Sequence, residues 1–95
     1  MRKGNIQRKT KETEIEIDVN LDGKGNYKIE TNFPFLSHML ELFAKFSGID
    51  IKIKAKGDIE VGPHHLVEDT GICLGQVIKQ ALGDKKGISR FGFSS

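Results

Sequence analysis

Two adjacent histidines and an acidic pair, His64, His65, Glu68 and Asp69, have types and spacing that fit metal chemistry. Imidazole and carboxylate groups are common ligands of divalent ions. Neighbouring residues on a helix are about 100° apart around its axis, so one ion cannot easily hold both rings. Glu68 lies one turn beyond both histidines and can share an ion with either of them. The motif therefore indicates two metal sites, each of which needs ligands from elsewhere.

A polar helix start is the alternative interpretation of the same residues. Acidic side chains are favourable in the first turn of a helix, and Pro63 suits the first helical position. His38 supports the metal interpretation, because it lies near the start of an earlier predicted helix. It becomes a natural additional ligand if both helices begin at the same end of a sheet. Spacing alone leaves that condition open.

Hydrophobic periodicity predicts the elements that would position these residues. Alternating apolar and polar residues predict strands, and apolar residues at helical spacing predict helices. Ser37 is a candidate cap of the first predicted helix, and Gly83 marks the end of the second. The predicted strands are 15–21, 27–31, 49–56 and a brief 59–61, and the predicted helices are 35–46 and 64–82. The turn residues between the first two strands predict that they form a hairpin.

The expected fold is α+β, a two-layer sandwich over residues 1–95. Its four-stranded, mostly antiparallel sheet carries two helices on one face, in the order β-β-α-β-β-α. Ninety-five residues, 37% hydrophobic and 29% charged, allow one small domain of this kind. Cys73 is the only cysteine and sits in an apolar helical stretch, so we expect a buried, inert thiol.

The composition gives no indication of a membrane or nucleic-acid partner. No apolar run approaches the roughly 20 residues of a membrane span, and no secretory signal follows the basic N-terminus, so cytoplasm is the expected compartment. The basic residues of segment 2–11 are interpreted as a solvated end. Lys52, Lys54 and Lys56 would line the wet face of a strand, and a net charge of +2 is too small to imply nucleic-acid binding.

Five segments of the chain resemble the imidazoleglycerol-phosphate dehydratase family of histidine biosynthesis. They are RKTKET at 8–13, LDGKG at 21–25, FLSHML at 35–40, HHLVEDTG at 64–71 and ALGDKKGISRFG at 81–92. The resemblance covers nearly the whole chain but only the N-terminal half of the family's catalytic unit, which is built from two similar halves. Each half carries one double-histidine motif.

The resemblance implies a binuclear manganese site, with other divalent metals such as zinc as possible occupants. His38, His65 and Glu68 would bind one ion. His64 would serve the other ion, whose remaining ligands come from the second half. This division agrees with the angular separation of His64 and His65 on a helix.

The family reaction removes water from imidazoleglycerol phosphate and gives imidazoleacetol phosphate, with metal assistance. Glu12 matches a substrate-contacting carboxylate suited to acid/base catalysis, and Arg90 matches a substrate-binding arginine suited to the phosphate. Without the resemblance, both are ordinary exposed charges. Phe46 stands where the family has a histidine, and a phenyl ring can neither bind through a nitrogen nor transfer a proton.

Smaller departures from the family pattern occur at Asn32, Ser37 and the Gly62-Pro63 pair. Together with Phe46 they suggest a half-domain altered to stand alone or to pair with itself. We expect a metal-binding half-unit that forms a homo-oligomer by half-half pairing, in which each ion receives His64 from another copy. Turnover by this half alone is expected to be weak or absent. The alternatives are a non-catalytic, metal-linked assembly module and a nucleic-acid-binding domain that uses the lysine row.

Overall fold

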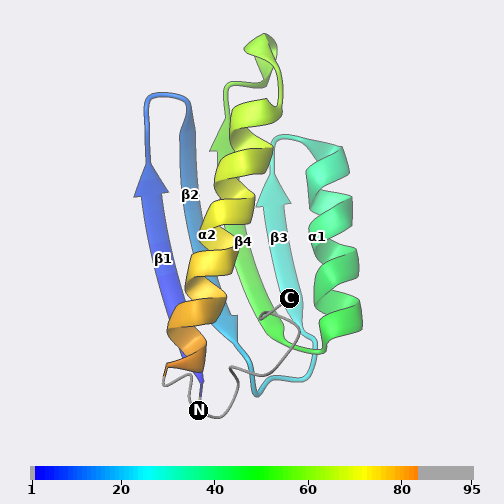
Figure 1. Cartoon of the computed structure of the whole chain (residues 1–95). Coiled ribbons are helices and arrows are strands. Elements are labelled where there is room, and N and C mark those ends of the chain that lie inside the picture. The colour runs from blue at the N-terminus through cyan, green and yellow to red at the C-terminus, as the bar shows by residue number, and fades with distance from the viewer. Residues whose placement is uncertain (1, 84–95) are drawn as a thin grey trace, which may run out of the picture.

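The computed structural model describes residues 2–83, which form an open two-layer α+β sandwich (Figure 1). This architecture confirms the predicted fold class, with four strands and two long helices. In chain order the elements are β1 (Lys3–Lys9), β2 (Thr13–Asn20), β3 (Tyr27–Thr31), α1 (Pro34–Ser47), β4 (Asp50–Gly57), a short 3₁₀ helix η1 (Ile59–Val61) and α2 (His64–Leu82). No helix within residues 2–83 has the length and apolar character needed to cross a membrane.

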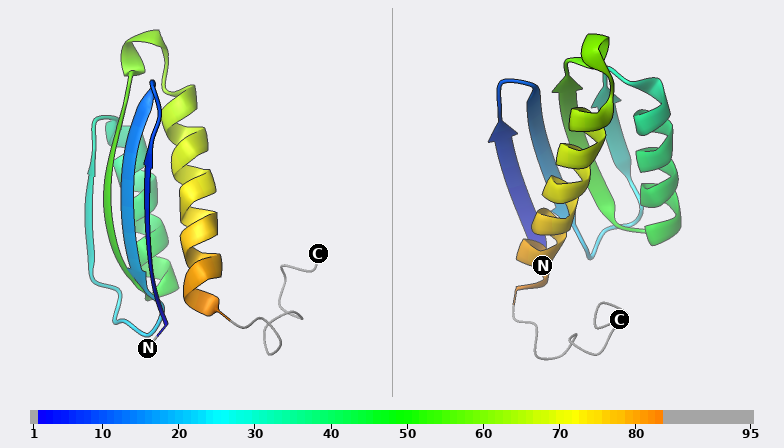
Figure 2. Two further views of the ribbon diagram at one scale, coloured as in Figure 1. Left: turned by 90° about the vertical axis from the view of Figure 1, so that its left-hand side faces the viewer. Right: turned by 45° about the horizontal axis from the view of Figure 1, so that its top comes forward.

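The four strands form one mixed sheet in the order β1-β2-β4-β3. β2 pairs antiparallel with both β1 and β4, whereas β3 and β4 are parallel and are connected through α1. Both helices lie on the same face of the sheet, and no helix within residues 2–83 covers the opposite face (Figure 2). α2 packs over β1 and β2, and α1 packs over β3.

The core lies between the sheet and the two helices. Alternate residues of the central strands point inward because side chains alternate between the two faces of a strand. They meet helix residues that recur every three or four positions. The buried apolar residues are Ile15, Ile17, Val19, Leu36, Leu40, Ala44, Ile51, Ile53, Ala55, Leu66, Cys73, Val77 and Ala81. The predicted burial of Cys73 is thereby confirmed, and burial raises the pKa of its thiol.

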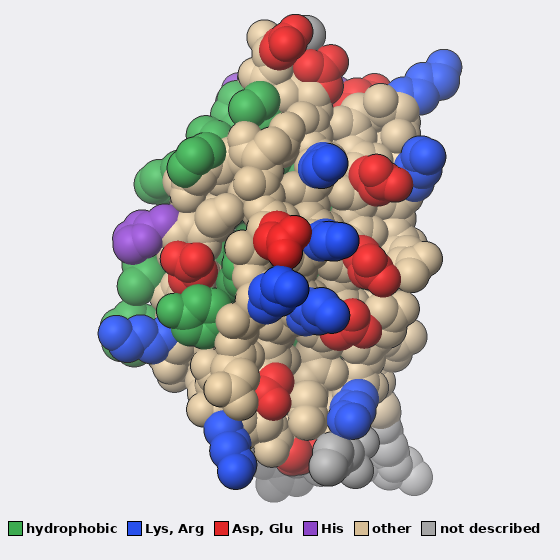
Figure 3. Space-filling model, turned by 180° about the vertical axis from the view of Figure 1, so that it is seen from behind, with side chains coloured by type: hydrophobic (Ala, Val, Ile, Leu, Met, Phe, Trp, Pro, Cys, Tyr) green, Lys and Arg blue, Asp and Glu red, His purple; other side chains and the backbone are tan. Residues whose placement is uncertain are grey.

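The outer face of the sheet is a mixture of acidic and basic side chains (Figure 3). The three predicted wet-face lysines of β4 are exposed on it. The strand register opposes each of them to an acidic residue of β2: Lys52 to Asp18, Lys54 to Glu16 and Lys56 to Glu14. Opposite charges at directly facing positions stabilise a sheet by roughly 0.2–1 kcal/mol per pair. The lysine row of β4 thus faces an acidic row of β2, so this face of the sheet carries charges of both signs.

The predicted hairpin between the strands at 15–21 and 27–31 is wrong. These strands are β2 and β3, and β4 lies between them in the sheet. The sequence alternation identifies both strands but not their partners. The loop after β2 passes the start of β4, where the carboxylate of Asp50 accepts hydrogen bonds from the backbone N–H groups of Lys24 and Asn26, both at 2.9 Å. The backbone N–H of Ile51 also donates to the carbonyl of Asn26, at 3.0 Å. These contacts hold the loop against β4 and direct the chain to the sheet edge.

The predicted strand at 59–61 is also wrong, because these residues form η1. Three residues followed by Gly62, whose φ is 119°, leave no extended segment that could join the sheet. The fourth strand is instead β1, within the segment interpreted as a solvated basic end. Ile6 is the only large apolar residue of β1, so the alternation that marks a strand is too weak there to be recognised.

The two long helices agree with their predicted ranges, and α2 begins and ends where expected. Ser37 does not cap α1, because the helix already begins at Pro34, after Phe33. The hydroxyl of Ser37 instead lies 2.6 Å from that of Thr31 at the end of β3. At Asn32 the side-chain amide donates to the carbonyl of Gly57, at 2.7 Å, and accepts from its N–H, at 3.1 Å. Ser37 and Asn32, two positions at which the chain departs from the family pattern, thus make hydrogen bonds that join the end of β3 to α1 and β4.

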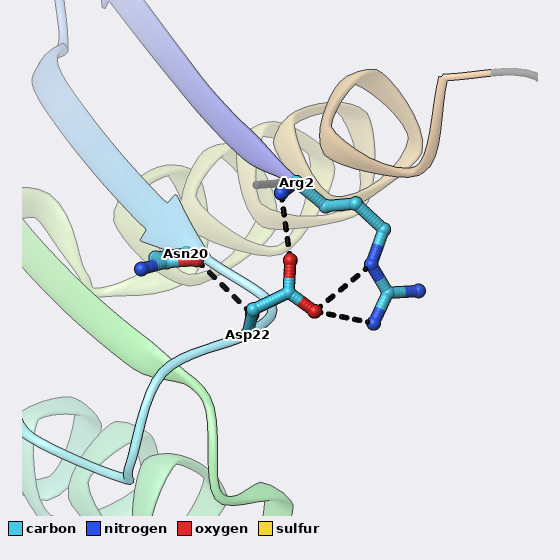
Figure 4. A network of polar contacts seen from close by, with 3 residues as sticks. All are labelled: Arg2, Asn20 and Asp22. Atoms are coloured by element: carbon cyan, nitrogen blue, oxygen red, sulfur yellow. Dashed lines mark hydrogen bonds and ion pairs between the residues drawn. The ribbon is translucent and has the colours of Figure 1, made fainter.

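A charged contact anchors the N-terminal end of β1 to the turn after β2 (Figure 4). The carboxylate of Asp22 accepts from the backbone N–H of Arg2, at 2.8 Å, and from the guanidinium, at 3.0 Å. The side-chain oxygen of Asn20 in turn accepts from the backbone N–H of Asp22, at 3.0 Å. Its hydrogen bonds to Arg2 lower the pKa of the Asp22 carboxyl.

The loop contact of Asp50 predicts a pH-dependent loss of stability. Hydrogen bonds from the backbone N–H groups of Lys24 and Asn26 lower the pKa of the Asp50 carboxyl. Its contribution is therefore complete above the ordinary aspartate pKa of about 4, and it is lost as the pH falls through the lower folded-state value. We expect Asp50→Asn to lower Tm near neutral pH and to reduce the loss of Tm below about pH 4.

The matched control for that prediction is Asp58→Asn. Asp58 is also exposed, and its carboxylate accepts no hydrogen bond within residues 2–83. Thermal unfolding of the three proteins, followed by circular dichroism across the acidic range, is the measurement. Equal pH profiles for the two variants would contradict the role given to Asp50.

Candidate functional site

The predicted metal ligands lie at one end of the sheet. β3 and β4 run parallel, so the helices that follow them begin at the same end, the upper end in Figure 1. His64, His65 and Glu68 belong to the first two turns of α2, and His38 belongs to the second turn of α1. All four side chains are exposed. The condition that makes His38 a natural additional ligand, two helix starts at one end of the sheet, is therefore met.

Glu12 lies at the same end, in the turn between β1 and β2. Its side chain is exposed, whereas its backbone is fixed on both sides. The N–H donates to the hydroxyl of Thr10, at 3.1 Å, and the carbonyl accepts from the N–H of Asp58, at 3.0 Å. The carboxylate is thus presented to solvent from a rigid turn close to the segment that leads into α2.

The segment leading into α2 depends on glycine at two positions. Gly62 has a φ of 119°, in a region that residues with a Cβ rarely adopt, and its successor Pro63 precedes His64 directly. Any side chain with a Cβ at position 62 would be strained in this conformation. At Gly57 a Cβ would lie 2.7 Å from the Cβ of Leu66, so β4 and the first turn of α2 approach closely only because that residue is glycine.

The donor set fits a divalent ion in chemistry but is incomplete in one copy. Imidazole nitrogens and a carboxylate suit Mn²⁺ or Zn²⁺, and all are accessible. Within residues 2–83, however, no three His, Cys, Asp or Glu side chains come close enough together to hold an ion. Any ion held at this end would therefore need donors from beyond residues 2–83 of the same copy.

A part-buried polar network ties α2 to the turn that carries Glu12. Asp69 accepts a hydrogen bond from the hydroxyl of Thr13, at 2.7 Å, and lies 3.6 Å from the guanidinium of Arg8. The sequence singles out Asp69 only as half of an acidic pair, and nothing in the local pattern connects it to Thr13. The neighbouring Thr70 is 1% exposed, and its hydroxyl has no hydrogen-bond partner among the described residues.

The remaining predicted residues lie away from this end or outside the described part. Arg90 is outside residues 2–83. Phe46 is in the last turn of α1, at the end of the sheet opposite to the predicted metal ligands, and it is 82% exposed. A hollow of about 950 Å³ lies over the outer face of the sheet and is lined by residues of all four strands, among them Lys3, Tyr27 and Lys52. It contains none of the predicted site residues.

Comparison with known proteins agrees with the resemblance seen in the sequence. The family model for imidazoleglycerol-phosphate dehydratase matches residues 31–95. The imidazoleglycerol-phosphate dehydratase of Hydrogenobaculum sp. (strain Y04AAS1) is 62% identical over 99% of this chain and 49% of its own length. That of Desulforudis audaxviator is 55% identical over 97% of this chain and 47% of its own length. The chain thus spans about half the length of these relatives, and it belongs to the imidazoleglycerol-phosphate dehydratase family.

Proposed function

We propose that the chain is a half-unit of an imidazoleglycerol-phosphate dehydratase whose metal sites are completed by a second copy. The observation that carries this proposal is the position of His38, His64, His65 and Glu68 at one end of the fold, exposed and insufficient for a site in one copy. In the assembled protein, His38, His65 and Glu68 of one copy hold an ion together with His64 of another. A symmetric arrangement of this kind makes both sites alike.

An apolar stripe on α1 supports self-association. It consists of Phe35, Met39, Phe43 and Phe46, which are spaced by three or four residues and therefore follow one flank of the helix. All four are exposed, and green side chains gather along the edge of the molecule that α1 occupies in Figure 3. Monomeric proteins rarely leave such a continuous apolar stripe in water.

The helix α2 offers a second surface of the same character. Val67, Gly71 and Gly75 follow one another at intervals of four residues, and Val67 is exposed. Nothing lies within 4 Å of the position that a Cβ would take at either glycine. Because the relatives are twice as long as this chain and the family has two similar halves, we assign both surfaces to a second copy of the chain.

The chemistry available to each copy is limited. Divalent ions supply Lewis acidity toward the imidazole ring of the substrate. Glu12 presents a carboxylate that can accept or return a proton, and Arg90 supplies a cation for the phosphate. Phe46 removes a histidine that the family uses, so we expect assembled sites to bind metal and to turn over imidazoleglycerol phosphate weakly or not at all. We place the assembly in the cytoplasm.

Native mass spectrometry with and without a chelator tests the proposal. We expect Mn²⁺ or Zn²⁺ to raise the mass of the assembly in steps tied to copy number, and the chelator to reverse the change, because ligands from two chains couple metal binding to association. His64→Ala should lose both the metal and the metal-dependent assembly. Gln76→Ala, at another exposed position of α2, is the matched control. Equal masses in all conditions would contradict the proposal.

A non-catalytic, metal-linked assembly module is the second candidate, and the phenylalanine at position 46 favours it. The two functions differ in turnover, not in metal content. A dehydratase assay on the metal-loaded assembly separates them. If the absent histidine at position 46 is the only defect, the turnover rate should increase in Phe46→His. No activity in either protein, with metal bound, would leave the assembly module as the function.

A further inference from the structure

Asp69 lies at the junction of the two segments that carry the predicted site residues. It follows Glu68 on α2 and accepts a hydrogen bond, at 2.7 Å, from the hydroxyl of Thr13, the first residue of β2. Thr13 is 3% exposed and the Asp69 side chain 17%, so this contact is largely shielded from water, where an unmade hydrogen bond is costly. The second carboxylate oxygen of Asp69 lies 3.6 Å from Arg8 of β1. One side chain thus joins α2 to both strands of the β1–β2 hairpin.

The direction of each hydrogen bond in this network follows from the number of protons available. The single hydroxyl proton of Thr13 is donated to Asp69, so its oxygen can only accept from the hydroxyl of Thr10, 3.0 Å away. The oxygen of Thr10 in turn accepts from the backbone N–H groups of Glu12, at 3.1 Å, and Thr13, at 2.9 Å. The proton of each hydroxyl is used, and the chain of hydrogen bonds runs without a gap from Asp69 to the backbone of Glu12.

We propose that Asp69 is a positioning residue that holds the Glu12 turn at a fixed place relative to the ligand-bearing turns of α2. The proposal rests on the proposed function, since it gives Glu12 and the α2 ligands a common site. Asp69 acts through Thr13 and Thr10 and makes no contact of its own with metal or substrate. Its role is to restrict the rotation of the first turns of α2, on which His64, His65 and Glu68 must keep their orientation.

Substitutions of Thr13 test the network while Asp69 is left in place. Thr13→Val removes the hydroxyl and keeps the shape, whereas Thr13→Ser keeps the hydroxyl. Loss of a group that orients metal ligands typically weakens metal affinity about 10- to 100-fold, and we expect about 10-fold weaker Mn²⁺ binding by calorimetry in Thr13→Val. Thr13→Ser should bind within about twofold of the unaltered chain.

Thr70→Val is the matched control. It is the same substitution at a buried position one residue from Asp69, and the Thr70 hydroxyl has no hydrogen-bond partner among the described residues. We expect it to leave Mn²⁺ affinity unchanged. If Thr13→Val and Thr70→Val change the affinity equally, general repacking of the core accounts for the effect and the proposal is overturned.

A metal-free measurement separates this inference from the proposed function. Backbone amide exchange, followed by NMR in the presence of a chelator, should accelerate about tenfold at Glu12 in Asp69→Ala, the size expected for one lost hydrogen bond. Asp69→Asn, which retains an acceptor oxygen for Thr13, should restore slow exchange. If the unaltered chain binds no Mn²⁺, the proposed function fails, but amide exchange at Glu12 still tests whether Asp69 holds the Glu12 turn. Unchanged exchange in Asp69→Ala overturns that role of Asp69.

Discussion

The variant Met39→Glu is expected to remain folded but to exist as a single copy under conditions in which the unaltered chain assembles. Met39 is 48% exposed and lies in the middle of the α1 stripe, so it contributes to the surface assigned to a second copy and not to the core. Burial of the exposed half of a methionine side chain contributes about 1 kcal/mol, and a symmetric interface loses it twice. The dissociation constant should therefore rise at least about thirtyfold, and a buried, unpaired carboxylate would raise it further.

Sedimentation or light scattering at several protein concentrations measures this effect, with circular dichroism as the test of folding. Gln76→Glu adds the same charge to an exposed position on α2 outside the apolar stripe of α1, and it is expected to leave the association unchanged. Glutamate is a good helix former, so neither variant should weaken its helix. Assembly of Met39→Glu at the same concentration as the unaltered chain would show that the α1 stripe is not the interface.

The sequence predicts the elements of this fold better than their arrangement. Alternation in β2, β3 and β4 identifies each strand, because each has one face against the helices and one in water. The alternation does not say which strands pair, and the loop after β2 resembles a hairpin turn although Asp50 directs it past β4. β1 escapes detection because it pairs with the edge of β2 and contributes little apolar surface of its own.

The candidate site shows the same limit. The spacing of His64, His65 and Glu68 predicts them as candidate ligands, since that information is local to one helix. Their position at the same end as His38 depends on β3 and β4 being parallel, and that of Glu12 depends on the antiparallel pairing of β2 with β4. Both are properties of the whole sheet. The contact of Asp69 with Thr13 joins residues 56 positions apart, and no local pattern could indicate it. Long-range hydrogen bonds of this kind follow from the fold and become visible only with it.

Ile53→Ala is expected to cause the largest loss of stability of any substitution considered for this chain. Ile53 is 1% exposed and lies at the centre of β4, the strand that separates β2 from β3. It faces Ile17 on one side and Ile29 on the other and belongs to the core between sheet and helices, so its removal leaves a cavity there. Substitutions of this type cost about 3 kcal/mol, a large part of the roughly 5–15 kcal/mol that stabilises a whole domain.

The neighbouring Lys54→Ala provides the control, because Lys54 points to the outer face of the same strand and is exposed. Lys54 faces the exposed Glu16 of β2, and its truncation should change the free energy of unfolding by no more than about 0.5 kcal/mol. Urea unfolding with a chelator present keeps metal binding out of the comparison. At about 4–8 °C of Tm per kcal/mol for a domain of this size, Ile53→Ala should unfold about 15 °C below the unaltered chain. Similar losses in the two variants would mean that the sheet does not bury its inner face against the helices.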